Sequence, residues 1–411
     1  MFKHPTRSVS RAPPVPFNAI SATWQLLLGM GILMLGAGLQ GTVISLRATL
    51  EGFPAPVTGA IMSCYYLGYM IGTALAPRLV RRVGHIRVFA AMAALAGASI
   101  LAQGLLISAL PWALLRAVSG LCFAAIYVVA ESWLNDRSSR ATRGTLFAVY
   151  MVVLYIGLGS SQFLLIPTDP RTSTPFMLVA ILISLAIVPI VIAAQSAPEI
   201  AVPQKVSWRD LYRDSPLGVV AVTIAGMVTS NVYSMGPVYA KLSGLDTSGV
   251  ATFMGISILA AVVMQYPVGR LSDRVDRRTV IASICILATV SAAVPAAFRT
   301  LPHGLILASA AVFSGLAFTL YSLGVSHVND HLEPTQMVAA SSALLRLNGI
   351  GAALSPVLVG GLIARFGPRA YFAALASLTG LLSLYDLWRK TRRQPVPPER
   401  KQPYGPGKSI V

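Results

Sequence analysis

The sequence predicts an all-α membrane protein with twelve transmembrane helices in two pseudo-symmetric bundles of six. Hydrophobic residues make up 55% of the 411 positions and the mean hydropathy is +0.69. Only 11% of the residues are charged, less than half the roughly 25% of soluble domains. Long runs without charge recur along the chain, and its two halves share sequence patterns at a nearly fixed offset. This composition excludes an ordinary water-soluble enzyme.

Runs without Asp, Glu, Lys or Arg mark most of the spans. A helix needs about 20 apolar residues to cross the hydrocarbon core, and the runs cover residues 22–46, 52–77, 88–115, 117–130, 144–168, 172–198, 215–240, 247–269, 279–298 and 300–329. Residues 88–130 are too long for one span, and Pro111 divides them into two. Residues 338–363 and 370–388 each carry one ionisable side chain and complete the set of twelve.

Basic residues gather on one side of this topology. If the N terminus is cytoplasmic, the inner segments hold 24 of the 32 Lys and Arg and the outer loops hold six. Because basic loops remain in the cytoplasm, we expect both termini to be cytoplasmic and the membrane to be a bacterial-type inner membrane. The net charge of +18 then reflects topology, and no nucleic-acid partner is expected, since that needs a folded soluble basic face.

The longest polar interruption divides the chain into two halves. We expect a cytoplasmic tail, a six-helix bundle, a cytoplasmic linker, a second six-helix bundle and a basic cytoplasmic tail, over residues 1–21, 22–198, 199–214, 215–388 and 389–411. The start is basic and then apolar, but no clear cleavage site follows, so we expect a retained first helix. Cys64, Cys122 and Cys285 fall inside spans, which predicts neither a disulfide framework nor a metal cluster.

Two internal repeats connect the halves. "YVVAESWLND" from Tyr127 matches "YSLGVSHVND" from Tyr321 at Tyr, Ser, Asn and Asp, with an offset of 194. The charge-rich stretches "PRLVRRVGHI" from Pro77 and "GRLSDRVDRR" from Gly269 match with an offset of 192. Positive-inside arginines alone explain the basic residues but not the matched Tyr, Asn and Asp. The pattern therefore favours a duplicated six-span unit, as in secondary transporters.

These residues resemble the major facilitator superfamily. "GRLSDRVDRR" is similar to its cytoplasmic loop motif between spans 8 and 9, Pro77 to Arg87 resembles the degenerate partner between spans 2 and 3, and "RAVSG" from Arg116 resembles the motif of span 4. "ESWLND" and "GLQGTVISLRATLEGF" are similar to uncharacterised bacterial permeases grouped beside sugar and drug carriers. The resemblance implies two bundles that rock about a central substrate site.

One departure bears on the direction of transport. Span 5 reads "YIGLGSSQFLL" without the Gly-Pro motif of drug antiporters, which lowers drug export without excluding it. We expect a secondary transporter of a small organic solute; an anionic solute and proton coupling both stay open. The alternatives are a proton-driven drug or metabolite efflux antiporter, a non-transporting receptor and a polytopic membrane enzyme. The expected partners are a small-molecule substrate, the lipid bilayer and, in the coupled case, protons, and we expect a monomer.

The charged stretches predict a cytoplasmic gate. An Asp can dock on a helix start and an Arg on a helix end, so we expect Arg274 or Arg278 to pair with Asp330 when the cytoplasmic side closes. In the first half, Arg81 or Arg82 would pair with Glu131 or Asp136. Asp273 has Arg81 as its counterpart in the first copy, so the acidic half of that latch must come from span 4. Topology alone also explains the arginines.

Ionisable side chains inside spans are costly and mark functional positions. Arg346 lies about 12 Å into span 11, and a buried guanidinium there, near Asn348, suits an anionic group on a substrate; snorkelling is the other interpretation. Arg116 is a second candidate. Pockets combine apolar walls with a few polar groups, and the remaining cavity candidates are Gln40, Thr42, Tyr65, Tyr127, Gln162, Asn231, Tyr233, Gln265, Tyr266 and Tyr321. A helix-to-helix hydrogen bond is the alternative for each.

Proton coupling needs a titratable group, and Glu131 and His327 are the candidates because spans 1, 7 and 8 contain no Asp or Glu. No phosphate-binding loop of the Gly-x-x-x-x-Gly-Lys-Ser/Thr type occurs, which disfavours an ATP-driven pump. His327, Asp330, His331 and Glu333 could bind a metal, but a short polar loop is the favoured interpretation. We therefore expect no catalytic residues, no metal and no cofactor.

Overall fold

The structure is a computed structural model that describes residues 23–138, 142–192, 208–298, 300–332 and 334–391. These ranges contain helices and no strand. Twelve of the helical segments are long and apolar enough to cross a membrane. The predicted fold class and the number of spans are therefore confirmed.

The first six spans are built from seven helices and one 3-10 turn. The fifth span continues from α6 into the turn η1, and the sixth is interrupted between α7 and α8. The bounds are α2 Trp24–Leu50, α3 Ala55–Val83, α4 His85–Leu105, α5 Ala109–Asp136, α6 Arg143–Ser160, η1 Ser161–Leu165, α7 Thr174–Leu185 and α8 Ile187–Ile192.

The last six spans follow a short helix, α9 (Trp208–Asp214), that precedes the seventh span. The tenth span is interrupted between α13 and α14. The matched Tyr321, Asn329 and Asp330 lie in α14 or directly after it. The bounds are α10 Pro216–Leu242, α11 Thr247–Arg274, α12 Arg277–Ala297, α13 His303–Ala317, α14 Leu320–Asn329, α15 Pro334–Phe366 and α16 Ala370–Lys390.

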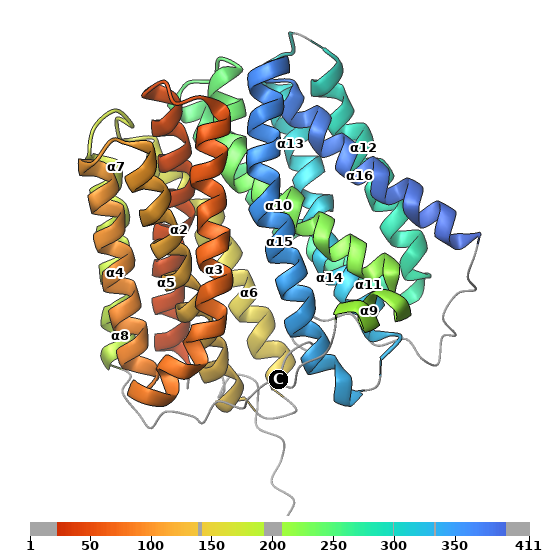
Figure 1. Ribbon diagram of the computed structural model, residues 1–411, viewed down its shortest axis with the longest axis horizontal. Coiled ribbons are helices and arrows are strands. Elements are labelled where there is room, and N and C mark those ends of the chain that lie inside the picture. Colours follow the sequence, from red (N-terminus) through yellow and green to blue (C-terminus); the bar gives the residue numbers. More distant parts are fainter. Residues whose placement is uncertain (1–22, 139–141, 193–207, 299, 333, 392–411) are drawn as a thin grey trace, which may run out of the picture.

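Helix packing repeats between the halves. In the first half α2 packs against α6 and α7, and α5 packs against α3 and α4. In the second half the equivalent helices do the same, since α10 packs against α15 and α16, and α13 packs against α11 and α12. Figure 1 shows the two groups side by side, with the first in red to yellow and the second in green to blue. The duplication predicted from the sequence is thus present in the packing.

The charge-rich stretches are helix ends more than loops. Gly269 to Arg274 form the last turns of α11, and α12 begins at Arg277, so only Val275 and Asp276 connect the two helices. The Asp276 side chain accepts a hydrogen bond from the backbone N–H of Arg278, which caps α12. In the first copy, α3 runs to Val83 and Gly84 has φ of 88°, a left-handed conformation suited to glycine. We call the end of the molecule with these two connections the basic end and the opposite end the far end.

Small residues allow α3 and α5 to approach closely. A Cβ at Gly120 would lie 1.9 Å from the carbonyl oxygen of Tyr65, and a Cβ at Gly68 would lie 1.9 Å from that of Ala117. Atoms at that separation overlap, so glycine is required at both positions. Close backbone approach of this kind holds helices together in lipid, where apolar burial gives little drive, and it fixes α3 and α5 as one unit.

The two bundles meet towards the far end. A Cβ at Gly59 of α3 would lie 2.3 Å from the Pro356 carbonyl oxygen of α15, and one at Gly159 of α6 would lie 2.6 Å from the Leu259 side chain of α11. Towards the basic end, Ala74 and Arg81 continue the α3 face that carries Gly59, yet both are exposed. The bundles are therefore packed at the far end and separated at the basic end.

Candidate functional site

Tyrosines from both bundles gather between them. Tyr69 of α3 lies 6.2 Å from Tyr65 and 6.2 Å from Tyr127 of α5, measured between ring centroids. Tyr233 and Tyr321 of the second bundle both interact electrostatically with Tyr155 of the first. We define the tyrosine cluster as Tyr65, Tyr66, Tyr69, Tyr127, Tyr155, Tyr233 and Tyr321, all of which are partly accessible although they lie inside membrane-spanning helices.

Glu131 lies at the edge of this cluster nearer the basic end. It follows Tyr127 by one helical turn on α5, so the two side chains share a face. Its carboxylate interacts electrostatically with the hydroxyls of Tyr69, Tyr150 and Tyr321 as well as Tyr127. The side chain is partly accessible, and within the described ranges no hydrogen bond or ion pair engages it. Glu131 therefore brings to the basic-end side of the cluster a carboxyl group without an ion-pair partner among the described residues.

Arg116 lies at the other end of the same helix and is covered by an aromatic ring. Its side chain is 4% exposed, and its guanidinium carbon lies 4.5 Å from the centroid of Tyr65. A cation over a tyrosine face is stabilised by the ring quadrupole. About 22 Å of helix separates Arg116 from Glu131 at 1.5 Å per residue, so the two do not neutralise each other.

Several predicted cavity residues connect helices through hydrogen bonds. Gln40 donates to Ser119 at 3.3 Å, and Thr42 donates to Gln162 at 2.6 Å, which joins α2 to α5 and to η1. In the second bundle Asn231 donates to Ser355 at 2.5 Å, Asn348 donates to the Val222 carbonyl at 3.0 Å, and Gln265 donates to Ser322 at 3.0 Å. The helix-to-helix alternative applies to these residues, although the Asn231 Oδ1 atom is buried without a hydrogen-bond partner.

Arg346 does not occupy the buried position that the sequence suggested. Its side chain is exposed, whereas Asn348, Gly351 and Ser355 on the same helix pack against α10. At 100° per residue, Arg346 lies roughly 140–200° around α15 from those three residues. Tyr266 is also directed outward, with 71% of its surface exposed. Spacing along a helix did not reveal which face meets a neighbour, and the expectation of a buried Arg346 was wrong.

A buried ion pair holds the basic end of the second bundle. Arg277 at the start of α12 donates to Asp330 at the end of α14 over 2.7 Å, and to the Ser326 carbonyl over 2.6 Å. The two charged side chains are 1% and 2% exposed. Asp273 lies 3.6 Å from the same guanidinium and is 38% exposed. Arg277 is thus the centre of an arrangement that fixes α11, α12 and α14 to one another.

The pairs expected for a closed gate are absent from the described residues of this structure, whose basic end is separated. The arginine on Asp330 was expected to be Arg274 or Arg278, but it is Arg277; Arg278 contacts Asp276 at 3.4 Å instead, and Arg274 is exposed. Four arginines lie within nine residues, and the sequence alone does not indicate which of them is most deeply buried. Arg277 is the most deeply buried one because α12 begins at this residue.

In the first bundle, Arg81, Arg82 and Asp136 are all exposed, and no pair of Arg81 or Arg82 with Glu131 or Asp136 occurs in the part of the chain that is described. His327 is buried beside His331, with ring centroids 4.9 Å apart and Arg277 and Arg278 in electrostatic range. Glu333 lies outside the described residues. Within them, no group of three His, Cys, Asp or Glu could hold a metal ion.

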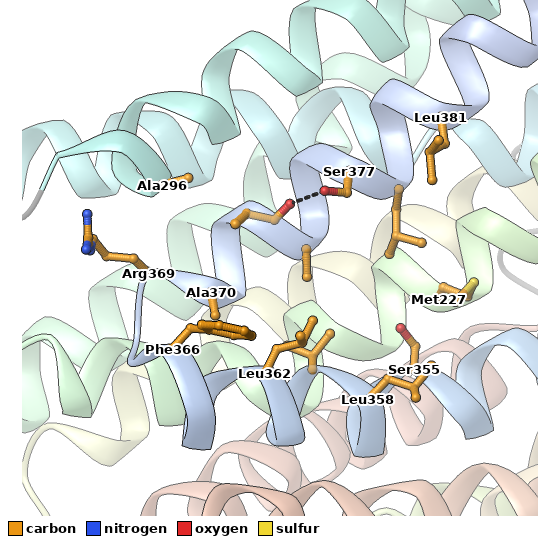
Figure 2. A pocket seen from close by; sticks show the side chains of 14 residues that line it. Met227, Ala296, Ser355, Leu358, Leu362, Phe366, Arg369, Ala370, Ser377 and Leu381 are labelled. Atoms are coloured by element: carbon orange, nitrogen blue, oxygen red, sulfur yellow. Dashed lines mark hydrogen bonds between the residues drawn. The ribbon is translucent and has the colours of Figure 1, made fainter.

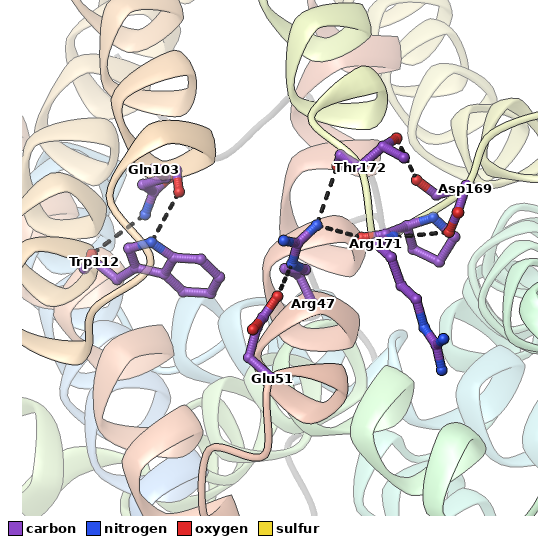
Figure 3. A network of polar contacts seen from close by, with 8 residues as sticks. Arg47, Glu51, Gln103, Trp112, Asp169, Arg171 and Thr172 are labelled. Carbon is purple, nitrogen blue, oxygen red and sulfur yellow. Dashed lines mark hydrogen bonds and ion pairs between the residues drawn. The ribbon is translucent and has the colours of Figure 1, made fainter.

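The far end of the first bundle has a polar lock that sequence reasoning missed. Arg47 at the end of α2 binds Glu51 at 2.5 Å and donates to the carbonyls of Pro170 and Thr172 at 3.2 Å each (Figure 3). These contacts join α2 to the connection before α7. Nearby, the Trp112 indole donates to the Gln103 carbonyl at 2.9 Å and ties α5 to α4. The spacing of Arg47 and Glu51, four residues apart on a helix, was the available signal.

A separate crevice of about 520 Å³ lies on the second bundle between α10, α15 and α16 (Figure 2). Its walls are mostly apolar, and Leu358, Phe366 and Leu381 are 58%, 65% and 63% exposed on the membrane-spanning surface. Ser377 donates to the Ala373 carbonyl and Ser355 accepts from Asn231, so both hydroxyls are used. Arg369 is the charged residue of the lining, and its guanidinium donates to the Ala297 carbonyl at 3.4 Å.

The family model of the Major Facilitator Superfamily matches residues 26–318 and 248–409 of the chain. The chain belongs to the major facilitator superfamily. This confirms the resemblance seen in the charge-rich repeats, and it agrees with the twelve spans and the duplicated packing.

Curated relatives and solved structures of the superfamily extend over nearly the whole chain. An uncharacterised MFS-type transporter of Enterobacter sp. strain 638 is 29% identical over 378 residues, covering 90% of this chain and 96% of that protein. The uncharacterised MFS-type transporter YcaD of Escherichia fergusonii is 28% identical over 377 residues, with the same coverage. Crystal structures of the nucleoside transporter NupG, and of a bacterial homologue of the human lysosomal transporter Spinster in an inward-facing and occupied conformation, have TM-scores of 0.74 each. Their identities are 12% and 11%; they cover 91% and 95% of this chain, and 100% and 99% of their own. At these identities the structures share the fold with this chain.

Proposed function

We propose that this secondary transporter of the major facilitator type carries a small organic solute by alternating access, with the tyrosine cluster as its binding site. The expected surroundings are a bacterial inner membrane with both chain termini in the cytoplasm, because the basic residues gather at one end. In that orientation the basic end is cytoplasmic and the structure is open inward.

One observation carries the proposal. The bundles pack through Gly59 and Gly159 in their far halves, while Tyr69, Tyr127 and Tyr321 remain partly accessible towards the separated basic end. A solute bound there would touch both bundles. Rocking about it would then close the basic end and open the far end, as expected for a site at the interface of two repeats.

For coupling, Glu131 is the stronger of the two proton candidates. It is partly accessible and lies among the cluster tyrosines, whereas His327 is 5% exposed and lies beside Arg277 and Arg278. A charged imidazole would be repelled by these guanidinium groups. We therefore propose Glu131 as the coupling carboxylate if protons drive transport.

Among the charged residues expected in the cytoplasmic gate, those with exposed side chains are the better candidates. Arg277 and Asp330 both belong to the second bundle, so their pair holds that bundle together and cannot itself join the two bundles. Asp273, Arg274, Arg81 and Arg82 have accessible side chains at the basic ends of α11 and α3. We propose that these groups meet the opposite bundle when the basic end closes.

Transport is tested by counterflow in proteoliposomes. The rocking motion is tested in the same assay with a disulfide that joins the two bundles. In a background with Cys64, Cys122 and Cys285 replaced by Ser, Gly159→Cys and Leu259→Cys would join α6 to α11, because a Cβ at Gly159 lies 2.6 Å from the Leu259 side chain. The matched control is Gly36→Cys with Ile183→Cys, where the corresponding distance is 2.9 Å within the first bundle.

Liposomes are preloaded with sugars, amino acids, organic acids, nucleosides or amines, and uptake of the labelled counterpart is measured. Oxidation should abolish counterflow only in the pair between bundles, and dithiothreitol should restore it. Equal activity of the oxidised and reduced interbundle variants would contradict alternating access. Absence of counterflow with every solute class would contradict transport itself.

A further inference from the structure

Glu131 and the surrounding rings also bear on the charge of the solute. Its carboxylate lies one turn from Tyr127 and within electrostatic range of Tyr69 and Tyr321. A carboxylate inside a span is expensive unless a positive group accompanies it. Within the described ranges no Arg, Lys or His forms an ion pair with Glu131. The site therefore presents to an incoming solute a carboxyl group that has no ion-pair partner among the described residues and is negative when deprotonated.

The ring surfaces have the same preference. Aromatic faces carry negative electrostatic potential and attract cations within about 6 Å. Tyr69 and Tyr127 present two such rings 6.2 Å apart, and Tyr233 lies 5.6 Å from Phe318 on the side of the second bundle. The Tyr127 hydroxyl is directed to the Met34 sulfur at 3.1 Å, so its ring is the part left for a ligand.

One ring of the tyrosine cluster already contacts a cation of the protein itself. The guanidinium of Arg116 lies 4.5 Å from the Tyr65 ring centroid, which is within the range of a cation–π contact. Arg116 is 4% exposed, and Arg346 is exposed on a different face of α15 from the one that contacts α10. The Tyr65 ring is thus a face of the cluster that already contacts a cation.

We propose that the transported solute is a monovalent organic cation, an amine or a quaternary nitrogen compound with an apolar body, whose charge lies beside Glu131 among the cluster rings. The inference rests on the transport function proposed above and specifies its substrate class. Glu131 supplies the charge, Tyr69 and Tyr127 supply ring faces from the first bundle, and Tyr321 supplies one from the second. The cation thus bridges the two bundles.

Three probes of one shape and different charge test the inference. N-methyl-4-phenylpyridinium is a fixed cation, 4-phenylpyridine at pH 8 is its uncharged counterpart, and biphenyl-4-carboxylate is an anion. Binding to the purified full chain in detergent is measured by equilibrium dialysis with the labelled probes. We expect the cation to bind at least about tenfold more tightly than the neutral probe, the size of effect given by a desolvated cation–π contact, and the anion to bind still more weakly.

Variants locate the charge. Glu131→Gln removes the coulombic attraction of the carboxylate, so it should reduce cation affinity about tenfold or more and leave the affinity of 4-phenylpyridine unchanged. Asp214→Asn is the matched control, because it removes a carboxylate that is 42% exposed on α9, away from the cluster. Tyr69→Phe keeps the ring and should retain cation binding, whereas Tyr69→Leu should weaken it.

The results separate the two proposals. Failure of the unmodified protein to prefer the cation, or equal cation affinity in Glu131→Gln and the unmodified protein, overturns the cation inference. Counterflow of sugars, organic acids or nucleosides alone would do the same while supporting transport. The charge series on the unmodified protein needs no variant, so poor folding of Glu131→Gln does not remove the test.

Discussion

Removal of the Asp330 carboxylate should destabilise the second bundle strongly. Asp330→Ala leaves the Arg277 guanidinium, which is 1% exposed, without its contact at 2.7 Å. Breaking a buried ion pair by deleting one partner costs about 3–5 kcal/mol. Arg277 keeps the Ser326 carbonyl at 2.6 Å and Asp273 at 3.6 Å. The remaining pair of Arg277 with the exposed Asp273 contributes at most about 1 kcal/mol. Because these contacts compensate in part, we expect the free energy of unfolding to fall by about 3 kcal/mol, the lower limit of that range.

The free energy of unfolding is measured in mixed micelles by titration with sodium dodecyl sulfate, followed by circular dichroism. Asp330→Asn retains an acceptor oxygen and should lose less, about 1.5–3 kcal/mol, the contribution of a hydrogen bond to a charged group. Asp273→Asn is the control and should lose under about 1 kcal/mol. A loss below about 1 kcal/mol for Asp330→Ala, or equal losses for Asp330→Ala and Asp273→Asn, would refute the assignment of Arg277 and Asp330 as the stabilising pair.

Two further predictions concern the α3 and α5 contact and the gate. Gly120→Ala places a Cβ 1.9 Å from the Tyr65 carbonyl oxygen and should lower the free energy of unfolding by about 3 kcal/mol or more, seen as loss of monodisperse protein in size-exclusion chromatography. Gly144→Ala, whose new Cβ has no atom within 4 Å, should behave like the unmodified protein. Equal behaviour of the two variants would contradict the packing argument. Asp273→Asn should shift the ratio of the open to the closed basic end by a fewfold, because an exposed ion pair contributes at most about 1 kcal/mol. This ratio is measured by the rate of maleimide labelling at a cysteine introduced at Ala74. An unchanged labelling rate together with unchanged counterflow would remove Asp273 from the gate.

The fold could be predicted from the sequence because membrane insertion is determined by local composition. Uncharged runs such as residues 22–46 correspond to helices, and Pro111 lies near the start of α5. The repeats of Tyr127 with Tyr321 and of Pro77 with Gly269 indicated the duplication that the helix packing shows. Helix ends were harder to predict. Charged residues of Gly269–Arg278 read as a loop, but Asp276 caps α12 and the helices continue almost without interruption.

The site could be predicted only in part. Tyr127, Tyr233 and Tyr321 were expected near the solute, and the spacing of Tyr65 to Tyr69 and of Tyr127 to Glu131 was available as a signal of shared faces. Arg346 failed because its orientation depends on where α10 packs, a contact between residues more than 120 positions apart. Arg277 was missed because four neighbouring arginines have the same local chemistry, and burial against α14 alone distinguishes it.

The close contact of Gly68 and Gly120 has a consequence for affinity. Because α3 and α5 cannot slide past each other there, Tyr69, Tyr127 and Glu131 keep their mutual positions throughout the cycle, like one jaw of a clamp. Tyr233 and Tyr321 form the other jaw, which moves relative to the first when the bundles rock. Rocking therefore changes only the separation of the two jaws, and the affinity for the solute should change with that separation.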